Sequence, residues 1–382
     1  MVSVRSASKP ISFLFLGETL LIPHLYPIME ALAQADPHTV IEAWTSTQTH
    51  EVLLGRWLAE SGIDHVRLRR APGWRRTSNP ERGINPHLPA KLPLLARLAP
   101  RLLCARAVVC AEQTSLWIPR IVRFMPPFVM NSHGAGTINA RDDPRQRFAA
   151  LKLVPSLREQ ETFLIRGFLP ERCVVTGYVK SGFKHLSQTH PLFKQARPVV
   201  LYNPHWQEHR SSWWAWGERT VADVLACGRY NLIFAPHQRL VEKVPGLRAL
   251  CETLSRRDDA VCDIDSFAAV DGSYPHTADI YLGDTSSQMF EFVSRPRPAV
   301  FLDPLARDWK GDPSLEMWRC GPVVTDPEAI LPTMEQAVTG HSAYAEVQRE
   351  LSTTWLGATD GSGPDIAAAA ILQFLVRLEA GG

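Results

Sequence analysis

The 382-residue chain has no strong charge of one sign. Its 41 lysines and arginines face 39 aspartates and glutamates, which gives a formal net charge of +2. A balance this close provides no extended field of the kind that attracts nucleic acid, because such partners select a strongly basic surface. We therefore expect no nucleic-acid partner.

Long apolar runs and closely spaced cysteine pairs are also missing. The first apolar run, ISFLFLG, is interrupted by Glu18 and Pro23 after too few residues to span a membrane, so it predicts a buried strand. The seven cysteines form no CxxC motif and lie mostly in apolar segments, which is typical of reduced thiols in a protein core. These features predict a cytoplasmic protein.

Metal-ligand and repeat patterns are absent from the sequence as well. No group of Asp, Glu and His has the compact spacing of a metal site, and no segment recurs at a fixed period. We expect no bound metal and no other cofactor. The missing repeats exclude a solenoid.

Apolar residues are plentiful enough for two α/β cores. They make up 45% of the chain, and 382 residues exceed one ordinary domain. Short β-branched or aromatic runs alternate with longer amphipathic segments such as the helix expected at 25–35, as in parallel sheets with crossover helices. The predicted strands are 11–16, 39–44, 65–68, 107–110, 128–131, 151–154, 173–176, 198–202, 231–234, 261–264, 279–282, 299–302 and 322–324. The fold class is therefore α/β, with two doubly wound, Rossmann-like domains whose ligand-binding edges face a central cleft.

The domain boundary is expected in a polar stretch without clear periodicity at 181–197. We place an acceptor-side domain at 1–180 and a nucleotide-donor domain at 181–345. The segment 346–382 includes the apolar-faced run DIAAAAILQFLVRL, and it predicts a helical segment that packs across both domains.

The sharpest candidate site follows the predicted strand at 279–282. This strand leads into Asp284, Thr285, Ser286 and Ser287, ahead of a helical segment. A cap at Asp284 or Thr285 would leave the first N–H groups of that helix free, and the helix dipole and the serine hydroxyls favour a phosphate there. The same residues could instead form a capped helix without a ligand.

Three histidines directly follow predicted strands. They are His133 before Gly134 in NSHGAG, His237 before Arg239 in FAPHQR, and His205 before Trp206 in NPHW. A histidine at a strand end suits general-base catalysis, because its pKa lies near neutral pH. We assign His133 and His237 to catalysis and the others to nucleotide contact, although a lone histidine is more often structural.

Three further charged residues are candidates for contact with a nucleotide. The N-terminal domain closes with VTGYVK, where Gly177 permits a turn and Lys180 could meet a phosphate. Lys180 could equally be a solvated surface lysine. Glu291 and Asp303 could hydrogen-bond the ribose or the base, or be ordinary helix-surface and strand-end carboxylates.

Basic residues are concentrated between positions 67 and 106, where Glu81 is the only acid. The same stretch contains LPLLARLAPRLLCARA, so apolar and basic side chains interleave. This pattern is typical of peripheral contact with an anionic membrane or with a lipid-linked, phosphate-rich acceptor. A solvated basic face fits the pattern as well.

Several motifs together resemble a known family. SHGAGT, VTGYVKSG, NPHW, FAPHQ, GDTSSQMFEFVSRPRPAVFLD and ATDGSGPDIAAAAI follow one another from residue 130 to 372. In order and spacing they resemble the CDP-glycerol glycerophosphotransferases, which are teichoic-acid and capsule polyol-phosphate enzymes. The chain departs from the family pattern at Ser132, where many members have an aromatic residue, at Lys180, where arginine is usual, and at His205, which replaces a smaller residue.

The resemblance implies a GT-B fold and the transfer of glycerol phosphate from a CDP-linked donor to a hydroxyl of a surface glycan or a lipid-linked acceptor. It assigns His133 the role of base and places His237 at the donor phosphates. It also implies that Asp284, Ser286 and Ser287 hold the diphosphate.

Two other functions fit the same residues. A nucleotide-sugar-dependent glycosyltransferase of GT-B fold would use the same base to activate attack at an anomeric carbon instead of phosphorus. A non-catalytic module that binds a nucleotide or a glycan would need the same fold without turnover.

Overall fold

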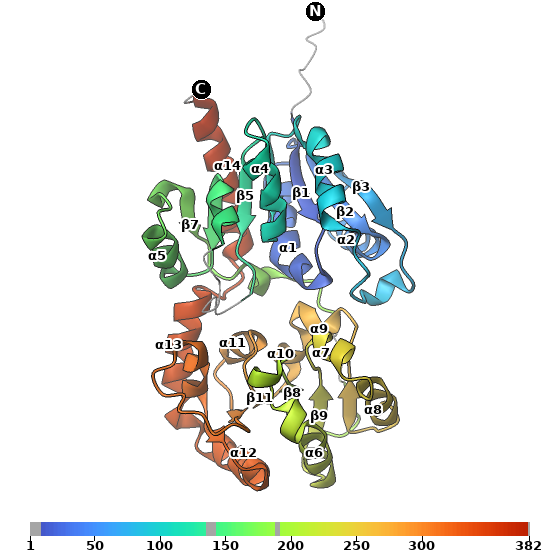
Figure 1. Cartoon of the computed structure of the whole chain (residues 1–382), viewed down its shortest axis with the longest axis vertical. Helices are drawn as coiled ribbons and strands as arrows, with labels where there is room; N and C mark the ends of the chain where they lie inside the picture. The colour runs from blue at the N-terminus through green and yellow to red at the C-terminus, as the bar shows by residue number, and fades with distance from the viewer. Residues whose placement is uncertain (1–8, 135–142, 188–191, 381–382) are drawn as a thin grey trace, which may run out of the picture. The chain divides into compact units, whose positions relative to one another are not determined.

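The computed structural model describes residues 9–134, 143–187 and 192–380, which divide into two α/β units (Figure 1). Unit 1 contains the described residues up to 134, those from 143 to 185, and those from 356 onward. Unit 2 contains 186–187 and 192–355. The chain passes from one unit to the other after His185, rather than at residue 180.

Unit 1 is built on a seven-stranded parallel sheet with the order β3-β2-β1-β4-β5-β6-β7. Its strands are β1 (Ile11–Phe15), β2 (Ile41–Thr47), β3 (Val66–Arg75), β4 (Ala107–Cys110), β5 (Phe128–Asn131), β6 (Leu151–Val154) and β7 (Cys173–Val175). Its α-helices are α1 (Ile22–Ala35), α2 (Gln48–Glu60), α3 (Lys91–Leu102), α4 (Trp117–Ile121), α5 (Leu157–Ile165) and α14 (Gly363–Ala380).

Unit 2 contains a six-stranded parallel sheet with the order β10-β9-β8-β11-β12-β13. Its strands are β8 (Val199–Asn203), β9 (Asn231–Phe234), β10 (Ala260–Cys262), β11 (Ile280–Gly283), β12 (Ala299–Leu302) and β13 (Val323–Val324). Its α-helices are α6 (Trp213–Ala226), α7 (Gln238–Lys243), α8 (Leu247–Leu254), α9 (Ala268–Asp271), α10 (Ser273–Thr277), α11 (Gln288–Val293), α12 (Ile330–Thr339) and α13 (Ala345–Leu356).

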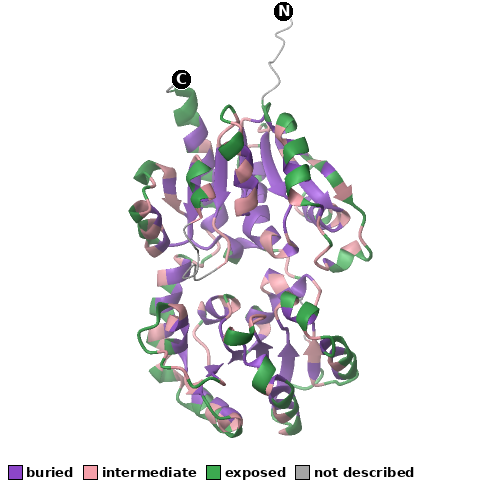
Figure 2. Cartoon of the chain, in the orientation of Figure 1, coloured by how far each residue is buried: buried purple, intermediate pink, exposed green. Residues whose placement is uncertain are grey.

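The predicted α/β class with two doubly wound domains is confirmed, because each predicted strand is present and both sheets are parallel. The strands are largely buried (Figure 2), as expected for sheets covered by helices on both faces. In unit 1, Leu94, Leu98 and Ile118 of α3 and α4 join the core on one face of the sheet. On the other face α1 packs against α14 (Figure 1).

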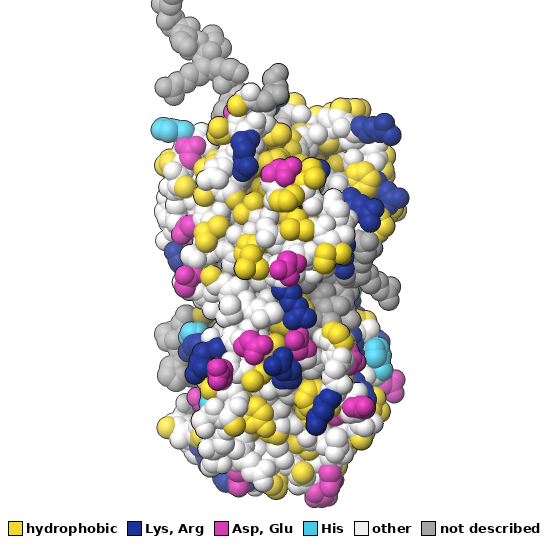
Figure 3. Space-filling model, turned by 90° about the vertical axis from the view of Figure 1, so that its left-hand side faces the viewer, with side chains coloured by type: hydrophobic (Ala, Val, Ile, Leu, Met, Phe, Trp, Pro, Cys, Tyr) yellow, Lys and Arg dark blue, Asp and Glu magenta, His cyan; other side chains and the backbone are white. Residues whose placement is uncertain are grey.

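The C-terminal segment is divided between the units. α13 belongs to unit 2 except for its last residue, and α14 belongs to unit 1. Among the described residues, no helix has both the length and the apolar character that crossing a bilayer demands. On the face drawn in Figure 3, basic and acidic side chains are interspersed, in keeping with the small net charge.

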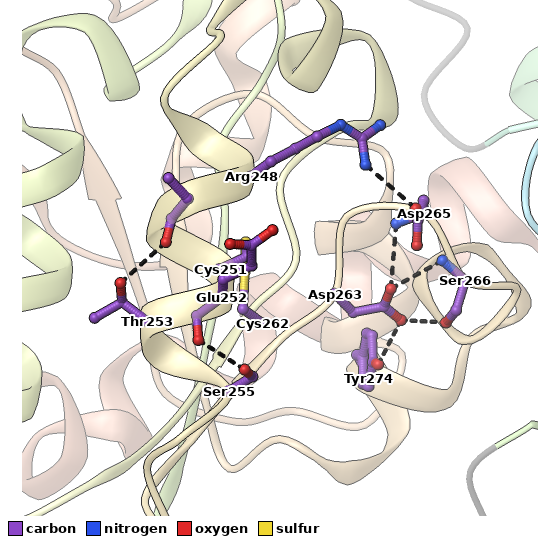
Figure 4. The surroundings of a disulfide bond; sticks show 11 residues. Arg248, Cys251, Glu252, Thr253, Ser255, Cys262, Asp263, Asp265, Ser266 and Tyr274 are labelled. Carbon is purple, nitrogen blue, oxygen red and sulfur yellow. Dashed lines mark hydrogen bonds and ion pairs between the residues drawn. A yellow bond between two sulfur atoms is a disulfide. The ribbon is translucent and has the colours of Figure 1, made fainter.

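One pair of cysteines corrects the expectation that all seven thiols are reduced. Cys251 of α8 and Cys262 of β10 form a disulfide, and their Cα atoms are 5.2 Å apart (Figure 4). The sequence did not reveal this pair, because the two residues are eleven positions apart and only the packing of α8 against the edge strand β10 brings them together.

Gly177 gives a test of the packing of the C-terminal segment in unit 1. Its φ is +79°, and a Cβ atom there would lie 2.9 Å from the carbonyl oxygen of Ala358, which accepts the N–H of Tyr178. We expect Gly177→Ala to reduce the free energy of unfolding by about 2–4 kcal/mol in urea titrations, because it adds both backbone strain and a clash.

Gly62→Ala is the matched control. Gly62 also has a positive φ, of +66°, but a Cβ atom there would meet nothing within 4 Å. This control should lose only about 1 kcal/mol from backbone strain. Equal losses in the two variants would contradict the close approach of Ala358.

Candidate functional site

Both sheets have a switch point in their strand order. It lies between β1 and β4 in unit 1 and between β8 and β11 in unit 2. In doubly wound folds, ligands bind beyond the carboxyl ends of the strands next to such a point, because the connecting loops diverge there and leave a crevice. The histidines and aspartates predicted from the sequence follow strands at or near these switch points.

Asp284 lies at the switch point of unit 2 and is fully buried. One carboxylate oxygen accepts the backbone N–H groups of His205 and Thr285, and the other accepts the N–H and the hydroxyl of Ser212. Burial raises the pKa of Asp284 to about 6, while these hydrogen bonds favour its ionised form. One side chain thereby joins the end of β11, the loop after β8 and the start of α6.

Asp284 and Thr285, which we predicted to bind a phosphate, make hydrogen bonds within the protein. The carboxylate accepts hydrogen bonds from the protein and would repel an anion. The Thr285 hydroxyl donates to the carbonyl oxygen of Arg210. Ser286 and Ser287 remain accessible, and α11 begins only at Gln288 and has six residues. The Ser286 hydroxyl accepts the N–H of Gln288, so Ser286 interacts with the start of this helix, rather than Asp284 or Thr285 as we expected.

His205 and His237 follow adjacent strands, β8 and β9, and their ring centroids are 5.8 Å apart. The Nδ1 atom of His205 accepts the backbone N–H of Gln207, and that of His237 accepts the N–H of Arg239, each at 3.1 Å. Since Nδ1 is an acceptor in both rings, the neutral imidazoles carry their proton on Nε2. Each ring therefore offers an N–H donor.

Burial keeps both imidazoles neutral. Burial lowers the pKa of His205 to about 3, and positive charge on His237 and Arg210 contributes to this shift. Burial also lowers the pKa of His237 to about 4, with a contribution from Arg239. A bound anion would act in the opposite direction and favour the protonated rings. This combination suits a phosphate, which can first accept a hydrogen bond from a neutral ring and then stabilise the protonated ring.

Trp206 adds an aromatic surface beside the two histidines. Its ring lies 5.8 Å from that of His205 and 6.2 Å from that of His237. The guanidinium of Arg239 and the ammonium of Lys243 lie over this ring at 5.3 and 4.7 Å, within the range of cation–π attraction. Trp206 and Arg239 thus lie beside the two histidines in unit 2.

Asp303, the predicted ribose or base contact, makes hydrogen bonds within the protein. Asp303 is fully buried, and its carboxylate accepts the N–H of Leu305 and both the backbone N–H and the Nε–H of Arg307. It shapes the loop after β12 instead of facing a ligand. Glu291 is half-buried in α11.

His133 follows β5 in unit 1. Burial lowers the pKa of His133, and the charge of Lys152 lowers it further, whereas an interaction with the backbone of Ala111 favours the protonated ring, and Glu112 and Glu18 also act against the shift. The ring is therefore neutral near pH 7. A neutral imidazole has one acceptor nitrogen, which can take a proton.

His24 was missed by the sequence analysis. It lies in the first turn of α1, and its ring is 6.4 Å from that of His133 and 5.7 Å from that of Tyr178. Burial lowers its pKa, with further contributions from Lys180 and His133. Its position at the start of the helix that follows the first strand was the available signal, because the first strand ends beside the switch point.

Buried charges lie directly behind His133. The hydroxyl of the adjacent Ser132 donates to Glu159, which is buried in the first turn of α5. Lys152 of β6 is also buried, its ammonium lies 4.4 Å from the ring centroid of Phe163, and burial lowers its pKa to about 8 while Glu159 opposes that shift. Buried charges are costly, so we interpret Lys152 and Glu159, which act on each other electrostatically, as support for the loop that carries His133.

The two predicted glycines and Lys180 have distinct places in unit 1. Gly134 has a φ of +80° and follows His133 directly, so it lets the chain turn away from the ring. Gly177 does not offer its backbone to a ligand, because Ala358 covers it. Lys180 is buried in a short 3-10 helix, η7 (Val179–Gly182), which packs against α1, so it is not a solvated surface lysine.

Asp284→Asn tests the carboxylate as a structural centre. The asparagine NH2 group would face backbone N–H groups that donate hydrogen bonds to the carboxylate, so donors would meet donors. We therefore expect the free energy of unfolding to fall by about 2–4 kcal/mol in urea titrations. Asp312→Asn is the control, since Asp312 only caps a 3-10 helix and asparagine caps equally well. Similar stability of the two variants would refute this role of Asp284.

The neutral histidines predict a dependence of stability on pH. Because the pKa of His237 falls from 6.5 to about 4 on folding, the unfolded chain binds more protons between these values, and its contribution to stability is lost as the pH decreases. Between pH 7 and pH 5 we expect this residue to account for about 1–2 kcal/mol.

His237→Asn isolates this contribution, since the asparagine Oδ1 can accept the N–H of Arg239 without titrating. The variant should lose about 1–2 kcal/mol less than the wild type over the same pH range in urea titrations. The raised pKa of Asp284 acts in the opposite direction but is common to both proteins. Parallel pH profiles would argue against a neutral, buried His237.

The sequence matches no protein-family model and no curated protein. Solved structures, in contrast, match it over nearly its whole length. The wall teichoic acid polymerase TagF has a TM-score of 0.61 at 14% identity, with 97% of this chain and 90% of that chain covered. UDP-GlcNAc 2-epimerase from Neisseria meningitidis, bound to UDP-GlcNAc, has a TM-score of 0.58 at 13% identity, with 97% and 100% covered. The S. aureus MnaA–UDP structure has a TM-score of 0.56 at 14% identity, with 98% and 97% covered. At this level of identity the likeness shows the fold alone, and this chain has the GT-B fold of two Rossmann-like domains.

Proposed function

We propose that this chain is a transferase that takes a CDP-activated donor and moves its glycerol-phosphate, or another polyol-phosphate, unit to a hydroxyl of a surface glycan or a lipid-linked acceptor. The observation that carries the proposal is the pair of neutral imidazoles at the ends of β8 and β9, beside the switch point of unit 2. Together with Arg239 they can bind an anion, and Trp206 provides an aromatic surface for a ring attached to that anion.

The charges around this group support a diphosphate. The carboxylates of Asp284 and Asp303 are turned into the protein, where they accept hydrogen bonds from backbone N–H groups. The Nε2–H groups of His205 and His237 and the guanidinium of Arg239 are donors. Donors aimed at the developing charge of a phosphoryl group stabilise its transition state more than its ground state.

His133 is the proposed base of the transfer. Its neutral ring takes the proton from the acceptor hydroxyl as the acceptor oxygen attacks the distal phosphorus of the donor. The bond between that phosphorus and the bridging oxygen breaks, its electron pair leaves with CMP, and a phosphodiester is formed. Phosphoryl transfer requires little covalent work from the protein, so positioning and charge neutralisation provide most of the acceleration.

An enzyme that acts on a nucleotide sugar is the second candidate. Epimerases that use UDP-GlcNAc share this fold at nearly the same TM-scores as the teichoic acid polymerase. The group of unit 2 would bind the diphosphate of UDP as well as that of CDP, because both carry the same charge. A glycosyltransferase would release UDP, whereas an epimerase would return a rearranged nucleotide sugar.

A donor assay distinguishes these functions. The purified protein is incubated separately with CDP-glycerol and with UDP-GlcNAc, with and without a polyol-phosphate acceptor, and the released CMP or UDP and any epimerised sugar are quantified. We expect CMP from CDP-glycerol, and donor affinity is measured in parallel by calorimetry. UDP or epimer formation without CMP would replace the first candidate by the second, and binding without any turnover would leave a non-catalytic module.

Variants assign the roles of the two histidines. His133→Ala should lower turnover by about 100-fold or more without weakening donor binding, since loss of a general base affects the chemical step. His237→Ala should weaken donor binding about tenfold, through the loss of one hydrogen bond to a charged group. His38→Ala, at an exposed position of unit 1, is the control. Full turnover by His133→Ala would exclude its role as the base.

A further inference from the structure

A basic and apolar surface of unit 1 lies outside the residues considered above. Three segments form it: α3, α4 with the residues that follow it up to 126, and the 3-10 helix η5 (Pro144–Phe148). α4 contacts both α3 and η5, so the three segments are continuous in space. We refer to them as the α3–α4–η5 surface.

Large apolar side chains are exposed on this surface. Ile121 and Phe124 are 70% and 76% exposed, and Leu92, Leu103 and Phe148 are exposed as well. The apolar residues on the inner side of α3 and α4 are already buried in the core of unit 1. The exposed side chains are therefore in excess of what folding requires, and such a concentration marks an interaction surface.

The charges on this surface are predominantly positive. Asp143, which caps η5, pairs with Arg145 and lies near Arg120. Between residues 82 and 134 the only acid is Glu112, which is buried and paired with Lys91. Four arginines are exposed and have no described carboxylate within ion-pair distance; they are Arg97, Arg101, Arg120 and Arg123. Only part of the basic segment 67–106 belongs to this surface, because Arg69 and Arg70 of β3 pair with Glu42 and Glu51.

Trp117 connects the apolar and basic parts of the surface. It is half-buried at the start of α4, with Arg120 at 4.7 Å and Arg145 at 5.7 Å from its ring. Tryptophan with nearby arginine is favoured where one end of a side chain is apolar and the other meets water and phosphate.

We propose that the α3–α4–η5 surface docks onto an anionic lipid bilayer. The side chains of Ile121 and Phe124 enter the boundary between head groups and acyl chains, while the four arginines contact lipid phosphates. Nucleic acid would use the arginines but would gain nothing from the exposed apolar side chains. The inference is independent of the proposed transfer reaction, since a bilayer would be recognised by this surface whichever donor unit 2 binds.

Vesicle flotation with the full-length protein tests the proposal. One set of vesicles contains equal parts phosphatidylcholine and phosphatidylglycerol, and the other contains phosphatidylcholine alone. We expect the protein to float with the anionic vesicles, to be released as salt is added, and to show little binding to the neutral ones. Ile121→Ser with Phe124→Ser should weaken anionic-vesicle binding about tenfold or more, and so should Arg120→Gln with Arg123→Gln.

Matched pairs of substitutions serve as controls. Ile165→Ser with Leu169→Ser removes two exposed apolar side chains next to α5, and Arg256→Gln with Arg349→Gln removes two exposed charges of unit 2. Both controls should bind anionic vesicles as the wild type does. Circular dichroism and sedimentation of each variant verify its folding and mass. Equal binding to both kinds of vesicle, unchanged binding by both α4 variants, or a wild-type dimer that dissociates on Ile121→Ser with Phe124→Ser, which would mark the surface as a contact between copies, would each overturn the proposal.

Discussion

A carboxylate removed from water is unfavourable unless donors from the protein replace its hydration. Asp284 satisfies this condition with four donors from three segments, the loops after β8 and β11 and the start of α6. The indole N–H of Trp318 also donates to its backbone carbonyl. The position of His205, and through the loop that of Trp206, depends on this one side chain. The residues of unit 2 that we propose to bind the nucleotide donor are thus held in place by the Asp284 carboxylate, which does not need to contact a ligand.

The two histidines of that group share one electrostatic design. In each ring a backbone N–H occupies Nδ1, and burial keeps the ring neutral. Two positively charged rings would repel each other, whereas a neutral imidazole takes up a proton only when a bound anion compensates for the charge. Burial also lowers the pKa of His133 in unit 1, although there the backbone of Ala111 favours the protonated ring.

Much of the site could be predicted from strand ends. An apolar run followed by Pro-His or by Ser-His-Gly predicts a side chain at the carboxyl edge of a parallel sheet, and the structure places His133, His205 and His237 at such edges. What each polar residue does there was harder to predict. Asp284 and Asp303 have the sequence context of ligand-binding residues, yet their carboxylates bind loops of the protein.

The sequence by itself determined the positions of the strands along the chain, the parallel sheets and the residues that end each strand, because alternating periodicity and turn residues are local signals. Only the tertiary structure decided which of those residues face outward. The donors to Asp284 from His205 and Ser212 are 79 and 72 positions away, Ala358 covers Gly177 from the other end of the chain, and Cys251 meets Cys262 only when α8 packs on β10. Such contacts depend on how loops approach one another in space, and no local pattern of residues encodes that approach.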